Sequence, residues 1–141
     1  SRLATLRAPL LGIERGNVFS FRNRDHGARD GSPLLPWIHA LLHAQGLLRV
    51  RQGRMSEALP QFAQAAMAAP DNLRYAYVHA IALYDAGQVP AAITELERAL
   101  ARHPDSPELL VGLRDYSQSM GDSAAATRYG KRLDEVLATA R

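Results

Sequence analysis

The sequence contains no cysteine among its 141 residues. Disulfide bridges, thiol nucleophiles and zinc–thiolate sites are therefore excluded. It also lacks any apolar run near the roughly 20 residues that a membrane-spanning helix needs, so we expect no membrane insertion. The chain opens Ser-Arg-Leu, without an initiator Met or a signal-peptide pattern. We therefore expect a processed chain or a piece of a longer protein.

Lysine is almost absent, because 16 of the 17 basic residues are Arg and only Lys131 is Lys. Most of the chain also has no excess of charge. Residues 1–35 hold six Arg against three acidic residues, a net of +3, whereas residues 36–141 hold 11 basic and 11 acidic side chains. No continuous basic stripe appears in the neutral part. We therefore expect no nucleic-acid partner and attribute the Arg bias to overall composition.

Motifs of catalysis are missing as well. The sequence has no phosphate-cradling Gly loop, no nucleophile elbow and no paired carboxylates, so we expect neither an enzyme nor a cofactor. His39 and His43 stand four residues apart, a helical spacing that suits a metal, but Ala40 stands where a zinc-protease helix has Glu. With no third ligand in view, we expect groove or surface histidines and no metal. His79 is expected at a helix interface with a hydrogen bond.

A 34-residue period is what the sequence does have. The positions that recur in one register are Gly53, Gly87 and Gly121; Ala58, Ala92 and Ala126; Pro70 and Pro104; and Phe62 and Leu96. Several independent positions share this spacing, which indicates an internal repeat. Each period reads as two helices, and the sequence predicts them over 35–52, 56–68, 72–86, 90–102, 107–120 and 123–140.

Cap and turn residues support these boundaries. The three recurring glycines end the first helix of each pair, where a left-handed backbone favours a residue without Cβ. Asp71, Ser106 and Asp122 are expected N-caps, because their side-chain oxygens can accept the first amide hydrogens of a helix. Gly46 and Ala80 stand in register on the first helices. Such small residues predict that the two helices of a pair approach closely.

These positions resemble the tetratricopeptide-repeat family, whose pattern is W-x2-L-G-x2-Y…A-x3-F…P. The resemblance covers about residues 39–138, and in the first repeat it rests on Leu42, Gly46, Ala58, Phe62, Ala65 and Pro70. It implies an all-α fold, a right-handed solenoid of about three helix-turn-helix repeats. The repeats are expected near 36–71, 72–105 and 106–140.

Residues 1–35 do not continue the pattern and are expected to form an irregular, Arg-rich N-terminal arm or linker. Within it the sequence suggests a short helix over residues 2–11, an extended segment over 17–21 and a polar loop over 22–32. Three roles remain open for the arm. It would cap the first repeat, fold into the groove, or simply link the repeats to a preceding domain.

In the family that this chain resembles, the first helix of each repeat lines a concave groove that binds a peptide or protein segment. By register, the groove residues here are His43, Leu47, Val50, Arg51, Arg74, Tyr77, Ile81, Tyr84, Asp85, Glu108, Val111, Asp115 and Gln118. Tyr77 and Tyr84 lie two helical turns apart, so they share a face, and aromatic rings offer contact area at low entropic cost. The alternative is that these tyrosines pack between repeats.

The partner is expected to be an apolar–aromatic peptide or an adjacent domain of the same chain. The family's Lys/Asn/Arg clamp for a C-terminal carboxylate is not matched, because its places hold His43, Leu47, Tyr77 and Ile81. The main alternative function is structural, as a docking or oligomerisation domain of a larger protein. An apolar stripe near the C-terminus favours a homodimer through the last helix, and it consists of Tyr129, Leu133, Val136 and Leu137.

Overall fold

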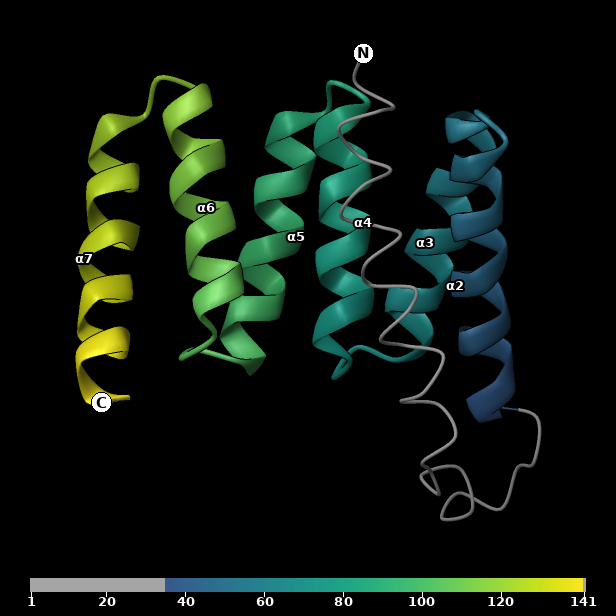
Figure 1. Ribbon diagram of the computed structural model, residues 1–141, viewed down its shortest axis with the longest axis horizontal. Helices are drawn as coiled ribbons and strands as arrows, with labels where there is room; N and C mark the ends of the chain where they lie inside the picture. The colour runs from purple at the N-terminus through teal and green to yellow at the C-terminus, as the bar shows by residue number, and fades with distance from the viewer. Residues whose placement is uncertain (1–34, 141) are drawn as a thin grey trace.

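The computed structural model describes residues 35–140, and the predicted arm segments over 2–11, 17–21 and 22–32 lie outside this range. Helices stand side by side in one row, with the first and the last at opposite ends (Figure 1). They are α2 (Leu35–Arg51), α3 (Met55–Ala68), α4 (Leu73–Asp85), α5 (Val89–Arg102), α6 (Pro107–Ser119) and α7 (Ser123–Thr139). The all-α repeat fold is confirmed, and each predicted helix end lies within one residue of the observed end.

The turns inside the three helix pairs all use glycine. Gly53, Gly87 and Gly121 have φ angles of +75°, +87° and +81°. This left-handed region strains any residue that carries a Cβ, which explains why glycine recurs at this position of the period. The prediction that these glycines end the first helices is confirmed.

Helix N-termini confirm two of the three predicted caps. The Ser106 hydroxyl accepts a hydrogen bond from the Leu109 amide, and the Asp122 carboxylate accepts one from the Ala125 amide. The third prediction, Asp71, is wrong. Because α4 begins at Leu73, its cap is the next residue along, Asn72, which accepts a bond from the Tyr75 amide at 3.2 Å. Asp71 is instead bonded to Arg102.

Small residues let the paired helices approach closely, as the register predicted. A Cβ added to Gly46 would lie 2.6 Å from Cδ1 of Phe62, well inside van der Waals contact. Ala58 on α3 and Ala92 on α5 are completely buried. The core then fills with larger side chains, each of which stabilises the fold by about 1.5–3 kcal/mol when fully buried. The largest of them are Tyr75, Phe62, Leu96, Leu109, Leu110 and Leu113.

The C-terminal apolar stripe is mostly covered by the neighbouring helix. Leu133 and Val136 are buried in one cluster with Leu110 of α6, and Tyr129 packs against that cluster. Leu137 alone of the four stays open, with 44% of its surface exposed. The surface left for the predicted homodimer is therefore one side chain and its surroundings.

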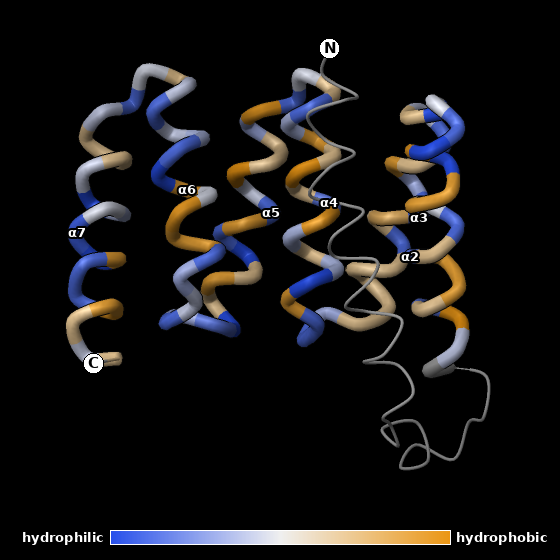
Figure 2. Tube along the Cα trace, in the orientation of Figure 1, coloured by the Kyte–Doolittle hydropathy of each residue, from blue (hydrophilic) through white to orange (hydrophobic). Residues whose placement is uncertain are grey.

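Apolar and polar residues alternate along most helices of the row (Figure 2). α2 differs, because apolar residues recur along much of its length and several remain exposed. Among the described residues, no helix combines the length and the hydropathy required to span a bilayer.

Candidate functional site

In the first repeat, three of the four predicted groove residues belong to the core. His43, Leu47 and Val50 are only 2%, 4% and 1% exposed. Leu47 and Val50 share a buried cluster with residues of α3 and α4, so these two side chains join α2 to its neighbours. Arg51 is the exposed member of the set. The groove-facing surface that the sequence assigned to α2 is thus mainly a helix contact.

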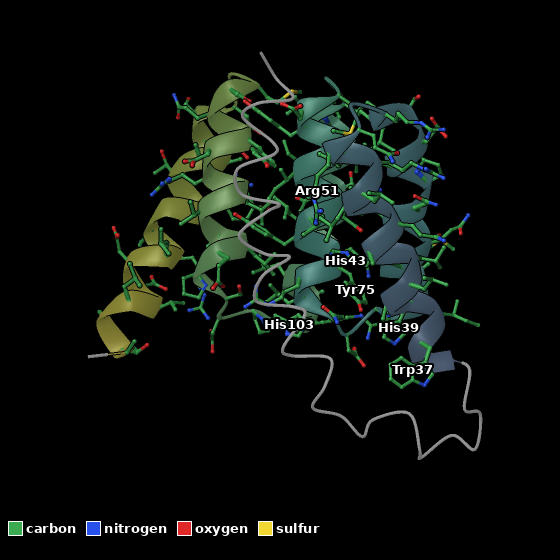
Figure 3. The ribbon with its side chains drawn as sticks, turned by 45° about the vertical axis from the view of Figure 1, so that its right-hand side comes forward. Trp37, His39, His43, Arg51, Tyr75 and His103 are labelled. Carbon is green, nitrogen blue, oxygen red and sulfur yellow. The ribbon has the colours of Figure 1, made fainter. Side chains whose placement is uncertain are left out.

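The two α2 histidines pack against one tyrosine of α4 (Figure 3). Nδ1 of His39 lies 3.1 Å from the Tyr75 hydroxyl oxygen, and the His43 ring centroid lies 4.6 Å from that of Tyr75. Burial, with a smaller effect from nearby His39, lowers the pKa of His43 to about 4. No cluster of three His, Cys, Asp or Glu side chains suited to a metal occurs within residues 35–140. The pair is therefore placed to hold the first two repeats together.

The second and third repeats meet through a stacked pair of tyrosines. The rings of Tyr84 on α4 and Tyr116 on α6 have centroids 4.2 Å apart and planes only 11° from parallel. Both side chains are partly buried against the core, so part of each ring faces outward. Burial raises the pKa of Tyr116, and the nearby tyrosines and carboxylates raise it further. The Tyr116 phenol therefore stays neutral near pH 7.

Acidic side chains surround these rings. Burial raises the pKa of the third tyrosine, Tyr77, and so do the negative charges of Glu108 and Asp115 on the next repeat. Asp85 and Asp115 act in the same way on Tyr116. Predicted groove residues of two repeats thus come together in one place. We name it the α4–α6 surface, and it consists of Tyr77, Tyr84, Asp85, Glu108, Asp115 and Tyr116.

The other predicted groove residues are spread around this surface. Arg74 is exposed in the first turn of α4, and Gln118 is exposed near the end of α6. Ile81 is partly buried against the cluster that contains Leu47. Val111 packs instead against the cluster between α6 and α7. The structure therefore divides the predicted set into a buried part at α2 and a partly exposed part at α4 and α6.

Tyr116 is the member of the α4–α6 surface that the register did not find. It stands two positions earlier in its repeat than Tyr84 does, so a strict match of groove positions passes over it. The sequence signal that could have found it is the residue type, since Tyr84 and Tyr116 are two aromatic residues 32 apart on the first helices of consecutive repeats. Because neighbouring helices are offset, rings at slightly different register positions can meet face to face.

A largely buried hydrogen bond between His79 and Glu95 joins α4 to α5 within the second repeat. The His79 ring donates to Glu95 at 2.7 Å, and Arg98 donates to the other carboxylate oxygen, also at 2.7 Å. Burial alone would raise the pKa of Glu95, but the bonds from His79 and Arg98 outweigh it and lower the pKa to about 2. The predicted interface role of His79 is confirmed, and both carboxylate oxygens of Glu95 accept a hydrogen bond within this cluster.

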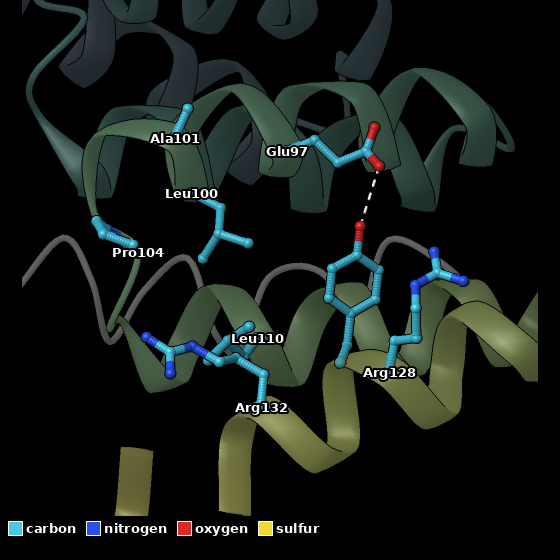
Figure 4. Close-up of a pocket in the computed structure, with 8 residues that line it drawn as sticks. Glu97, Leu100, Ala101, Pro104, Leu110, Arg128 and Arg132 are labelled. Atoms are coloured by element: carbon cyan, nitrogen blue, oxygen red, sulfur yellow. Dashed lines mark hydrogen bonds between the residues drawn. The ribbon is translucent and has the colours of Figure 1, made fainter. Parts of the chain in front are cut away.

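A shallow pocket of about 510 Å³ lies between α5, α6 and α7 (Figure 4). Leu100, Pro104 and Leu110 contribute apolar surface to its lining. At the rim, the Tyr129 hydroxyl donates to Glu97 at 3.0 Å. The rim cation Arg132 bonds to Asp105 at 2.6 Å. None of the predicted groove residues lines this pocket, so it is separate from the α4–α6 surface.

Solved structures of similar shape are helical-repeat proteins. MamA MSR-1 superposes with a TM-score of 0.65 and 21% identity over 73% of this chain and 59% of that one. MamA AMB-1 in its C2221 form gives 0.63 and 20% over 96% and 98% of the two chains. The type III secretion translocator chaperone SycD of Yersinia enterocolitica gives 0.63 and 17% over 76% and 78%. These identities establish a shared fold.

This chain spans 59% and 53% of the length of the first two MamA structures. No curated protein matches it in sequence. A family model does match, since residues 43–107 fit the model described as tetratricopeptide repeat. That match covers the central helices, and the same 34-residue period and helix pairing continue on both sides of it. Residues 43–107 therefore match the tetratricopeptide-repeat family, and the fold of residues 35–140 is of the same repeat type.

Proposed function

We propose that this protein is an interaction scaffold, without catalytic activity, that binds a peptide or protein segment at the α4–α6 surface. The observation that supports it is the gathering of Tyr77, Tyr84 and Tyr116 from two repeats, with each ring partly exposed. Tyrosine side chains provide a large contact area and lose little conformational entropy on binding. The family and the fold are consistent with this role, since repeats of this kind use extended surfaces to bind other proteins.

The chemistry of the surface favours a segment that combines apolar or aromatic side chains with a basic residue. Burial raises the pKa of Tyr77, and the negative charges of Glu108 and Asp115 raise it further. A lysine or arginine of the partner placed there gains from these carboxylates and from the faces of the rings, where cations bind favourably. Binding should therefore weaken as salt is added.

Selection of peptides from a random display library on the purified protein tests the proposal. We expect enriched peptides to pair an aromatic or aliphatic residue with Lys or Arg. Tyr77→Ala and Asp115→Asn should each weaken these peptides by about tenfold, typical of interface residues that cost more than 1 kcal/mol. The matched control, Arg128→Ala on the exposed side of α7, should bind as the parent does. Peptides that bind all variants equally would contradict the α4–α6 surface as the site.

The second candidate is a docking or oligomerisation role within a larger assembly, with a homodimer through the last helix. The exposed Leu137 favours it, because it is the uncovered member of an otherwise buried apolar stripe. Light scattering across a concentration series distinguishes the two candidates. A dimer that becomes a monomer on Leu137→Glu, with helix content kept, supports the homodimer. A monomer at all concentrations contradicts it.

A further inference from the structure

The outward side of α2 carries an uncovered apolar surface. Trp37, Leu41 and Leu48 are 65%, 58% and 45% exposed, and Ile38 beside them is 45% exposed. Their spacing of four and seven residues places these side chains on one side of the helix. Figure 3 shows Trp37 at the start of α2, apart from the His39–Tyr75 contact. We name these four residues the α2 end face.

The repeat register shows what normally covers this face. Adding 34 to Leu41 gives Tyr75, and adding 68 gives Leu109, which are 1% and 0% exposed. Tyr75 is buried with Ala65 and Ala66 of α3. Leu109 belongs to one buried cluster with Leu96 and Ala99 of α5. At both places the cover is therefore the second helix of the preceding repeat.

No described helix stands in that position beside α2, since it is the first of the row (Figure 1). The residues one period before α3 are 21–34, and they are poorly suited to the task. They read FRNRDHGARDGSPL, with two glycines, a proline and few apolar residues. Glycine and proline are the two residues least favourable to a helix interior. From its sequence we therefore do not expect the in-register segment to supply the missing cover.

We propose that residues 3–13, folded as a helix, cover the α2 end face. Leu3, Leu6, Leu10 and Ile13 follow each other at spacings of three, four and three, which forms one apolar stripe on a helix. The stripe spans roughly 15 Å at the helical rise of 1.5 Å per residue, and Trp37 to Leu48 spans roughly 16 Å by the same rise. The two apolar surfaces are therefore matched in length.

Proline in the middle of this segment does not prevent a helix. Pro9 would remove one backbone hydrogen bond. The described part of the chain already tolerates this, because α3 continues through Pro60. The segment also contains Gly12, and α7 likewise continues through Gly130. A helix over 3–13 with one proline and one glycine therefore uses only features that the described helices already contain, and unlike 21–34 it carries a continuous apolar stripe.

The tether also favours residues 3–13 over a separate molecule. Residues 14–34 join the segment directly to the start of α2, and 21 residues can extend over roughly 70 Å, far more than the length of α2. A segment held in this way is present at an effective concentration in the millimolar range. A second copy of the chain would have to compete against that concentration for the same face.

Trp37 reports on the proposal directly, because it is the only tryptophan of the chain. In the protein of residues 1–141 we expect blue-shifted Trp37 emission and weak quenching by acrylamide. Leu6→Glu introduces a charge into the stripe, so emission should shift to the red and quenching should increase. Ala8→Glu adds the same charge on the opposite side of the predicted helix. It should leave both signals as in the parent.

Two further measurements keep the result decisive. Leu10→Glu should reproduce Leu6→Glu, while far-UV circular dichroism confirms that α2–α7 stay folded in each variant. Fully exposed Trp37 emission in the folded parent would overturn the proposal. So would buried emission that is indifferent to both leucine variants. If burial of Trp37 instead depends on protein concentration, a second copy covers the face and residues 3–13 do not.

Discussion

The two ends of the helix row come from the same repeated unit but meet the solvent differently. At the first helix, α2 leaves Trp37, Leu41 and Leu48 largely exposed. At the last helix, the exposed positions are mostly polar or charged, and Leu137 is the one large apolar residue open to solvent in α7. A solenoid needs a polar outer side on its terminal repeat. α7 meets that need by its own sequence, whereas α2 has the composition of an internal helix.

The space between the paired helices also differs between the two ends. At the first repeat, Gly46 lies so close to Phe62 that no Cβ fits between the helices. At the last repeat, a Cβ on Gly130 would lie 3.6 Å from Cδ of Arg114, an ordinary contact. The contacts of α2 with its neighbours are therefore tightly fitted although its outer face is open. We expect the first repeat to respond more strongly than the last to changes in packing or charge.

The largest expected effect is on the pH dependence of stability at the first repeat. The pKa of His43 falls from the usual 6.5 to about 4 on folding, because burial penalises its charged form. Above pH 6.5 the ring is neutral in both states and stability is complete. Between pH 6.5 and 4 only the unfolded chain takes up the proton, which costs about 3 kcal/mol of unfolding free energy.

Urea titrations at pH 7 and pH 4 measure this loss. His43→Gln should remove much of it, because the variant has no ring to protonate in either state. Some decline will remain, since burial also lowers the pKa of His39. His103→Gln, a change of the same type away from α2, should keep the full decline. Equal pH dependence in the parent and His43→Gln would show that the α2–α4 contact does not govern acid stability.

Next in size is a comparison of two glycine substitutions. Gly46→Ala forces a methyl group into the Phe62 ring, and overpacking of this kind costs about 1–3 kcal/mol. Gly130→Ala meets no clash and replaces a poor helix former, so it should gain up to about 1 kcal/mol. Thermal or urea unfolding of the two variants beside the parent measures both. A stabilised Gly46→Ala protein would contradict the close approach of α2 and α3.

A smaller effect belongs to the aromatic stack in the middle of the row. Tyr84→Ala and Tyr116→Ala each remove buried area, but their interaction is isolated by a double-mutant cycle. Stacked aromatic pairs contribute about 0.5–1.5 kcal/mol beyond the area that they bury. We expect a coupling energy in that range from unfolding of the two single variants and the double variant. Strict additivity would mean that the rings do not stack in solution.

Much of this fold was predictable because the same residue types recur at the same helix ends in each 34-residue period. Turn glycines with positive φ recur every 34 residues, so helix ends followed from single residues. The cap at α4 did not, because Asp71 and Asn72 are both good caps and only the exact start at Leu73 selects between them.

The candidate site was less predictable, since it depends on distances between helices. His43 and Tyr77 occupy the same register position, yet the first is buried and the second is partly exposed. Tyr75 packs directly on His43. Tyr84 meets Tyr116 at the same spacing of 32 residues that separates His43 from Tyr75. In both cases the partner becomes evident only when the helices are placed in space.

The smallest expected effect concerns α7, the helix at the polar end of the row. Leu137→Glu replaces a side chain that is 44% exposed near the end of α7. Surface substitutions of this kind usually change stability by less than about 0.5 kcal/mol. The buried members of the same stripe, Leu133 and Val136, stay in contact with α6 and hold the helix in place. We therefore expect urea unfolding of Leu137→Glu to match the parent at low protein concentration, where any dimer is dissociated. A loss above 1 kcal/mol there would mean that α7 needs cover as α2 does, and the contrast between the two ends would fail.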